Sequence, residues 1–130
     1  MKKIHSFLLM ALTLLISTYV GAVTPISSKA DLLTYFNEKS GNGSVYDLQL
    51  TTNIEVDETL YLYAKENDEG NTINLDLNGN TLTFTKITGI ELFKGELNII
   101  GSGYVASGYT GKGTSYVIMV YGYNDENTSE

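Results

Sequence analysis

The chain has 130 residues and a formal net charge of −7, and it contains no cysteine, arginine or tryptophan. Without cysteine there is no disulfide framework, no thiol chemistry and no cysteine-based metal site, so the fold must depend on packing and backbone hydrogen bonds. The negative charge disfavours contact with nucleic acid or anionic lipid, and we expect neither as a partner.

The first 22 residues have the pattern of an export signal. Two lysines at the start precede an apolar stretch over residues 7–20, and small residues stand at Gly21 and Ala22. An apolar run of about 14 residues is shorter than the roughly 20 that span a bilayer. We therefore predict a signal peptide over residues 1–22, no membrane span after its cleavage, and a bacterial protein that is extracellular, on the cell surface or in the periplasm.

One short helix is predicted after this leader. Ser28 is suited to accept a hydrogen bond from an early backbone N–H, and Asp31 is placed near the positive end of the helix. Apolar side chains then form one stripe until Gly41. These signals predict a helix over residues 29–39 and a change to β structure beyond it.

Alternating apolar residues dominate the rest of the chain. This period of two places one face of each strand in a core and the other in solvent. The alternating positions are Leu48 and Leu50, Ile54 and Val56, Leu60 and Leu62, Ile73, Leu75 and Leu77, Leu82 and Phe84, Ile90 and Leu92, and Leu97 and Ile99. We predict one β domain over residues 23–123, interrupted by a charged loop at 65–70 and followed by a disordered tail at 124–130.

The strands repeat along the sequence. Residues 75–80 align with 97–102 at an offset of 22, and residues 90–95 align with 117–122 at an offset of 27. Spacings of this size are typical of stacked supersecondary units. They predict that Leu75 and Leu97 lie above one another in neighbouring turns.

Two segments resemble a known family. The run from Ile73 to Thr83 and the run from Gly95 to Gly103 resemble the right-handed parallel β-helix proteins of the pectin-lyase-like superfamily, and the helix at 29–39 resembles their N-terminal cap. The resemblance implies an all-β fold, a right-handed parallel β-helix of about three coils with a short capping helix.

An antiparallel β-sandwich is the alternative fold. Asn78-Gly79 between alternating apolar residues is also a two-residue hairpin signal, which would pair Leu75 with Leu82 and Ile73 with Phe84.

The strand-like segment 116–121 would leave a final rung uncovered. Unpaired backbone groups on such a rung can recruit another strand or chain, so we expect self-association through this end. The same pattern is also expected of a fragment of a longer protein.

We consider two functions, of which the enzyme is the one that the resemblance implies. The first is a secreted or surface noncatalytic module, a scaffold or adhesin-like binder of a glycan or a cell-surface protein; the alternative is the truncated N-terminal part of a polysaccharide lyase or glycoside hydrolase. Family lyases use a strong base, often arginine, which this chain lacks, and the single histidine is His5 in the leader. We therefore expect no catalytic residue, no metal site and no cofactor.

Tyrosine is enriched, with ten residues. Exposed aromatic rings offer flat apolar faces that stack on sugars or on partner side chains. We predict that a carbohydrate-binding surface, if present, includes Tyr104 and Tyr109.

Overall fold

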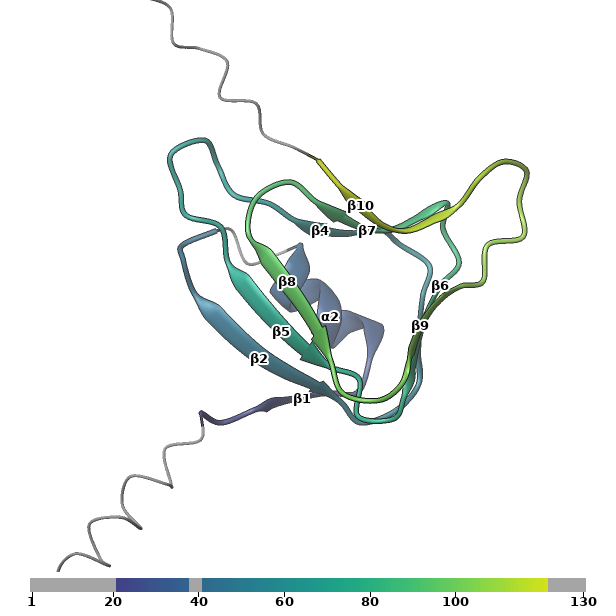
Figure 1. Ribbon diagram of the computed structural model, residues 1–130, viewed down its shortest axis with the longest axis horizontal. Helices are drawn as coiled ribbons and strands as arrows, with labels where there is room; N and C mark the ends of the chain where they lie inside the picture. The colour runs from purple at the N-terminus through teal and green to yellow at the C-terminus, as the bar shows by residue number, and fades with distance from the viewer. Residues whose placement is uncertain (1–20, 38–40, 122–130) are drawn as a thin grey trace, which may run out of the picture.

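The computed structural model describes residues 21–37 and 41–121, and its strands pair in parallel with strands of neighbouring turns (Figure 1). In chain order the elements are β1 (Thr24–Ile26), α2 (Lys29–Phe36), β2 (Val45–Leu50), β3 (Ile54–Val56), β4 (Leu60–Leu62), β5 (Thr72–Asp76), β6 (Thr81–Phe84), β7 (Thr88–Leu92), β8 (Glu96–Ile100), β9 (Tyr104–Ser107) and β10 (Tyr116–Val120).

Three successive turns of chain wind around one core and form three sheets. Sheet A has the order β1-β2-β5-β8, sheet B has β3-β6-β9, and sheet C has β4-β7-β10. We call the turns rung 1 (β2 to β4), rung 2 (β5 to β7) and rung 3 (β8 to β10). In Figure 1 the chain runs counterclockwise while successive rungs approach the viewer, which is a right-handed winding. The predicted parallel β-helix of about three coils is confirmed, and the sandwich alternative is wrong.

Inward side chains stack in columns through the rungs. Leu48, Leu75 and Ile99 are in register across sheet A, and the first two are fully buried. The prediction that Leu75 stacks on Leu97 is wrong, because Leu97 pairs with Ile73 at an offset of 24 residues. The offset of 22 aligned Gly79 with Gly101, but both glycines lie at corners, and the lengths of the corners differ between rungs.

The turn at Asn78-Gly79 is a corner of the solenoid. Both residues have positive φ, 49° and 77°, as the hairpin signal requires, but β5 and β6 belong to different sheets. Asn78 Nδ2 donates to the Leu50 carbonyl at 3.1 Å, and the Gly79 N–H donates to the Ser102 carbonyl at 2.7 Å. These two bonds link the corner to the rungs on either side, so the turn supports stacking.

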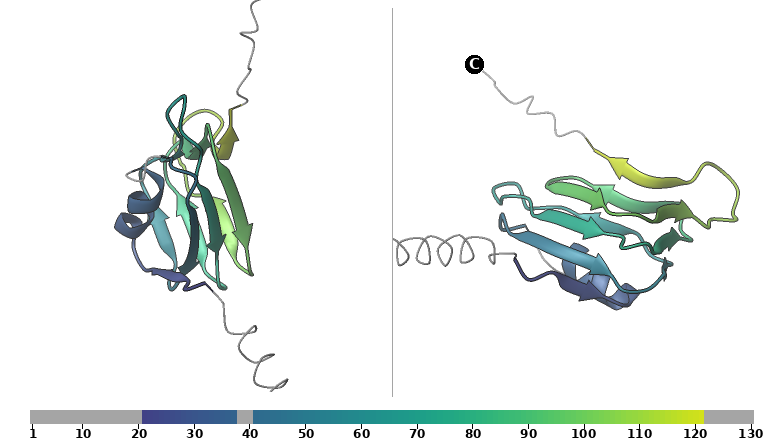
Figure 2. Two further views of the ribbon diagram at one scale, coloured as in Figure 1. Left: turned by 90° about the vertical axis from the view of Figure 1, so that its left-hand side faces the viewer. Right: turned by 60° about the horizontal axis from the view of Figure 1, so that its bottom comes forward.

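The helix closes the N-terminal end of the solenoid (Figure 2). It begins as predicted, with Ser28 Oγ accepting from the Asp31 N–H at 3.2 Å. It ends at Phe36 with Asn37 as its C-cap, earlier than the predicted residue 39. Its buried face carries Leu32 and Phe36, which join the core beneath rung 1.

Two predictions concern segments outside the described residues: the leader, apart from Gly21 and Ala22, and the tail at 124–130. Among the residues that the structure describes, no helix has the length and apolar content needed to cross a bilayer.

Candidate functional site

Four aromatic side chains are exposed on the outer face of sheet C, and we call them the aromatic strip: Tyr61, Tyr63, Phe93 and Tyr121. Each is 38–41% exposed. Tyr61 lies between Leu60 and Leu62, which are buried inward residues, so the alternation of the strand directs its ring outward. A set of large rings on one face is a candidate binding surface.

The strip is ordered by the register of the strands. The backbone N–H of Phe93 donates to the Leu62 carbonyl, and that of Tyr121 donates to the Leu92 carbonyl, each at 2.9 Å. These equivalent bonds place Tyr63, Phe93 and Tyr121 one above another at the ends of successive strands. The Phe93 and Tyr121 rings are stacked, with centroids 4.4 Å apart and planes 3° from parallel. Three rungs about 4.8 Å apart extend the column over roughly 10 Å.

Acidic groups surround the strip. Glu91 is in register with Tyr61, on the same outer face. The adjoining loop carries Glu66, Asp68 and Glu69, and Lys94 Nζ, next to Phe93, donates to the Glu66 carbonyl at 3.1 Å. The surroundings therefore combine apolar rings with carboxylate acceptors and disfavour anionic ligands.

Comparison with known proteins does not identify this chain. The chain matches no family model, no curated protein and no solved structure. The fold therefore rests on its own strand pairing, and the functional argument rests on the surfaces described here.

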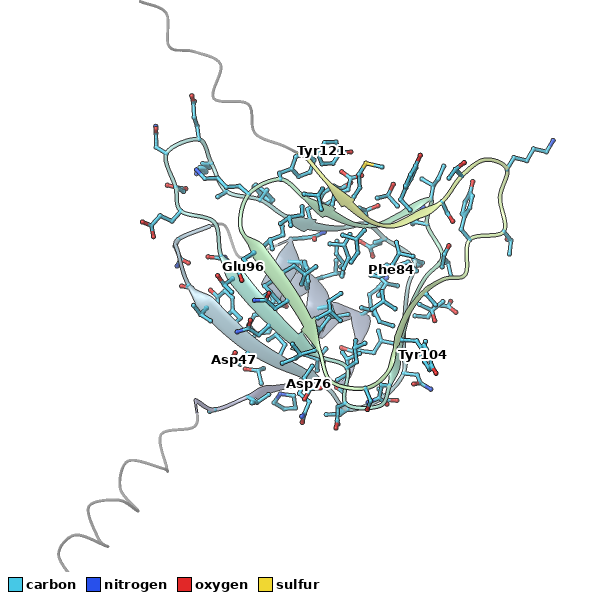
Figure 3. The ribbon with its side chains drawn as sticks, in the orientation of Figure 1. Asp47, Asp76, Phe84, Glu96, Tyr104 and Tyr121 are labelled. Atoms are coloured by element: carbon cyan, nitrogen blue, oxygen red, sulfur yellow. The ribbon has the colours of Figure 1, made fainter. Side chains whose placement is uncertain are left out.

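The two tyrosines predicted from sequence lie apart from the strip. Tyr104 begins β9 in sheet B and is 75% exposed, projecting from the rung as labelled in Figure 3. Tyr109 lies in the loop between β9 and β10, where its hydroxyl donates to the Lys112 carbonyl at 3.2 Å. Its ring also lies against Gly111. Tyr104 is thus presented to solvent, whereas Tyr109 contacts its own loop, and their role in binding stays a prediction.

The outer face of sheet A is polar instead of aromatic. Asn98 Nδ2 donates to Asn74 Oδ1 at 2.9 Å, and Asn74 Nδ2 donates to Asp47 Oδ1 at 2.7 Å, which forms a ladder across three rungs. Gln49 Nε2 donates to Asp76 Oδ2 at 2.9 Å. The carboxylates of this face, labelled in Figure 3, are therefore engaged by amide donors. Within residues 21–37 and 41–121, no three side chains of the metal-binding types gather into a cluster.

Among the described residues, the titratable groups with shifted pKa values lie on the capping helix or in contact with it. Lys29 Nζ donates to Asp57 Oδ1 at 2.7 Å and to Glu58 Oε1 at 2.8 Å. These hydrogen bonds raise the pKa of Lys29, and the one from Lys29 lowers the pKa of Asp57. The groups are exposed and tie α2 to the turn between β3 and β4, so they serve the cap and not a reaction site.

Proposed function

We propose that this protein is an exported, noncatalytic β-solenoid module that binds a neutral polysaccharide on the aromatic strip, in a scaffold or adhesin-like role. The observation that carries the proposal is the set of four half-exposed aromatic rings on one face of sheet C, in which Phe93 and Tyr121 hold each other in place by stacking at 4.4 Å. A sugar ring presents a patch of C–H groups that packs on an aromatic face, and tyrosine hydroxyls can hydrogen-bond its rim.

Charge supports a neutral ligand over an acidic one. Residues 23–130 carry six lysines against fifteen acidic residues, and Glu91 stands on the strip's own face. An acidic polysaccharide would have to approach these carboxylates without arginine to offset them. Neutral sugars avoid this repulsion, and carboxylates accept hydrogen bonds from their hydroxyl groups.

We also propose kinship with the pectin-lyase-like superfamily. The cap helix, the parallel rungs and the corner at Asn78-Gly79 support it. Kinship would keep the catalytic alternative open, in which this chain is the truncated N-terminal part of a polysaccharide lyase or glycoside hydrolase. The noncatalytic role is favoured because the chain has no arginine and its single histidine is in the predicted leader, which leaves lysine as the base for elimination.

The test is calorimetric titration of the protein with neutral soluble polysaccharides and, in parallel, with polygalacturonate. We expect binding to at least one neutral polymer and none to the acidic one. Phe93→Ala removes the central ring of the strip and should weaken binding about tenfold.

Two further variants complete the experiment: a matched control on sheet A and a substitution of Tyr104, which was predicted from the sequence. Ile100→Ala removes an exposed apolar side chain from sheet A and should leave affinity unchanged. Tyr104→Ala asks whether the isolated tyrosine contributes. Full affinity in Phe93→Ala together with lost affinity in Tyr104→Ala would reject the strip and favour the Tyr104 surface; release of unsaturated or reducing sugar by the unaltered protein would favour the enzyme.

A further inference from the structure

The two ends of the solenoid are finished differently, and the N-terminal end is closed. Helix α2 covers the inner edge of rung 1 with Leu32 and Phe36, both fully buried. The Asn37 side chain takes the place of a neighbouring strand: its Oδ1 accepts from the Tyr61 N–H at 2.8 Å and its Nδ2 donates to the Thr59 carbonyl at 3.3 Å. Strand β1 covers the same end of sheet A by pairing with β2. At this end, therefore, the apolar columns are covered by α2, and the edges of β2 and β4 are occupied by β1 and by the Asn37 side chain.

The C-terminal end of the solenoid is open within the residues that the structure describes. Strands β8, β9 and β10 are the last members of their sheets, and no described strand pairs with their outer edges. The column Leu60, Ile90 and Ile118 is fully buried at its first two positions and 39% exposed at the third. The column that ends in Val120 is buried at Leu62 and 67% exposed at its end. Figure 1 looks directly onto this rung, in front of α2.

Residues 122–130 do not repeat the alternating apolar pattern of β10. Residues 122–130 contain one aromatic and no aliphatic side chain, among three acidic residues. A second copy of the chain, in contrast, offers the same set of inward residues on a rung of the same shape. We propose that two copies of this chain associate through their open ends, rung 3 against rung 3.

The closed end dictates the symmetry of this assembly. Head-to-tail stacking would bring the open end of one copy against the helix cap of the next, where α2 lies over the ends of sheets B and C and the Asn37 side chain occupies the backbone edge of β4. Contact of two identical ends requires a two-fold axis and gives a closed dimer, not a fibre. An axis through the middle of β10 runs that strand antiparallel to its copy and keeps both inner faces inside, with Ile118 opposite Ile118. It also places β8 of each copy over β9 of the other.

Charge is compatible with this contact. Residues 95–121 contain one acidic residue, Glu96, and one basic residue, Lys112, whereas residues 41–94 contain nine acidic residues and three lysines. The open rung is therefore the least acidic part of the module. The two-fold rotation brings the corner that carries Lys112, between β9 and β10, over the partner's corner at which β8 begins with Glu96. In the dimer, Lys112 of each copy then faces Glu96 of the other copy, so the contact contains two pairs of opposite charge.

Sedimentation and engineered disulfides test the proposal. We expect a monomer–dimer equilibrium for the unaltered chain, and the equilibrium should stop at the dimer. Ile118→Asp places a charge in the contact and should weaken dimerisation more than tenfold, while Met119→Asp, on the outward side of the same strand, should leave it unchanged. Because the chain lacks cysteine, Ile118→Cys should cross-link to its own copy on oxidation, and Ala30→Cys on the closed end should not.

A pair of charge-reversing surface substitutions tests the same contact without changing an inward side chain. Lys112→Glu should weaken the dimer about threefold at low salt, and Glu96→Lys added to it should restore the affinity. Monomers up to about 1 mM, a ladder of higher oligomers, or equal cross-linking by Ile118→Cys and Ala30→Cys would each overturn the proposal.

Discussion

Glycines at the corners of the rungs occupy backbone conformations that other residues resist. Gly103 has φ of 133° and stands where β8 turns into β9; a Cβ there would collide with the Asn80 carbonyl and lie 2.8 Å from Leu77 Cβ. Gly113, in the loop before β10, has φ of 104°, but nothing lies within 4 Å of a Cβ placed on it. The two glycines thus share a backbone conformation that would strain any other residue, and they differ in how crowded the position is.

This difference predicts unequal effects of the same substitution. Gly113→Ala should lower the free energy of unfolding by about 1–2 kcal/mol, from backbone strain alone. Gly103→Ala adds overpacking against backbone and should cost about 3–5 kcal/mol. Urea unfolding of both variants measures the difference. Equal losses of unfolding free energy would show that the backbone at Asn80 moves to accommodate the added methyl group.

The start of α2 predicts a dependence of stability on acid. The Ser27 N–H donates to Asp31 Oδ2 at 2.9 Å, and this bond, with that to Ser28, holds the pKa of Asp31 below its usual 3.8. A carboxyl whose pKa is lower in the folded state contributes stability that is complete above the unfolded pKa, about 4, and is lost as pH falls through the folded value.

Asp31→Asn should therefore lower the thermal midpoint at pH 7 and have a smaller effect at pH 3. Glu55→Gln, on the outer face of sheet B and away from the helix start, is the matched control for loss of a carboxylate. Thermal melts across this pH range measure the gap between variant and unaltered protein. A gap that stays constant from pH 7 to pH 3 would contradict the role assigned to Asp31.

At the scale of the elements, one rung shields the next. In the column of sheet A, Leu75 is fully buried between two rungs, whereas Ile99 is half-buried because no described strand lies beyond it. Leu75→Ala should cost about 3 kcal/mol, from lost burial and the cavity that remains. Ile99→Ala should cost about 1 kcal/mol in dilute solution. Equal losses in urea unfolding would mean that the open end is covered in solution.

The inner and outer faces of the strands could be predicted from sequence because alternation is a local property. Leu48, Leu75 and Leu82 were each predicted to be apolar core positions, and each is buried. The helix start was also predictable, since Ser28 and Asp31 act within one turn of chain. The hairpin signal at Asn78-Gly79 specified the backbone of a tight turn, but it did not determine whether the flanking strands pair.

Over the whole molecule, no single spacing relates the rungs. Val45 pairs with Thr72 at an offset of 27, and Leu60 pairs with Ile90 at 30. Between rungs 2 and 3 the offset is 24 for β8, 23 for β9 and 28 for β10. Extra residues are absorbed in corner loops, whose closure entropy grows slowly with length. The predicted offsets of 22 and 27 were therefore close but wrong.

The candidate site depends on this register. Tyr61 and Tyr63 were recognisable as sharing one strand face, but Phe93 is 30 residues beyond Tyr63 and Tyr121 another 28. Nothing local in the sequence indicates that these rings form one column. The spacing becomes meaningful only when the length of every corner between them is known.

The sequence by itself determined the strands, their buried faces and the cap helix, because these follow from short-range periodicity and turn chemistry; the parallel solenoid was predicted from the repeat and the family resemblance, beside the sandwich alternative. The tertiary structure decided which strands are neighbours, which aromatic rings gather on sheet C and which end is left open. Those outcomes depend on pairings between residues 23 to 30 positions apart, and loops of unequal length set those pairings without altering the alternation within any strand.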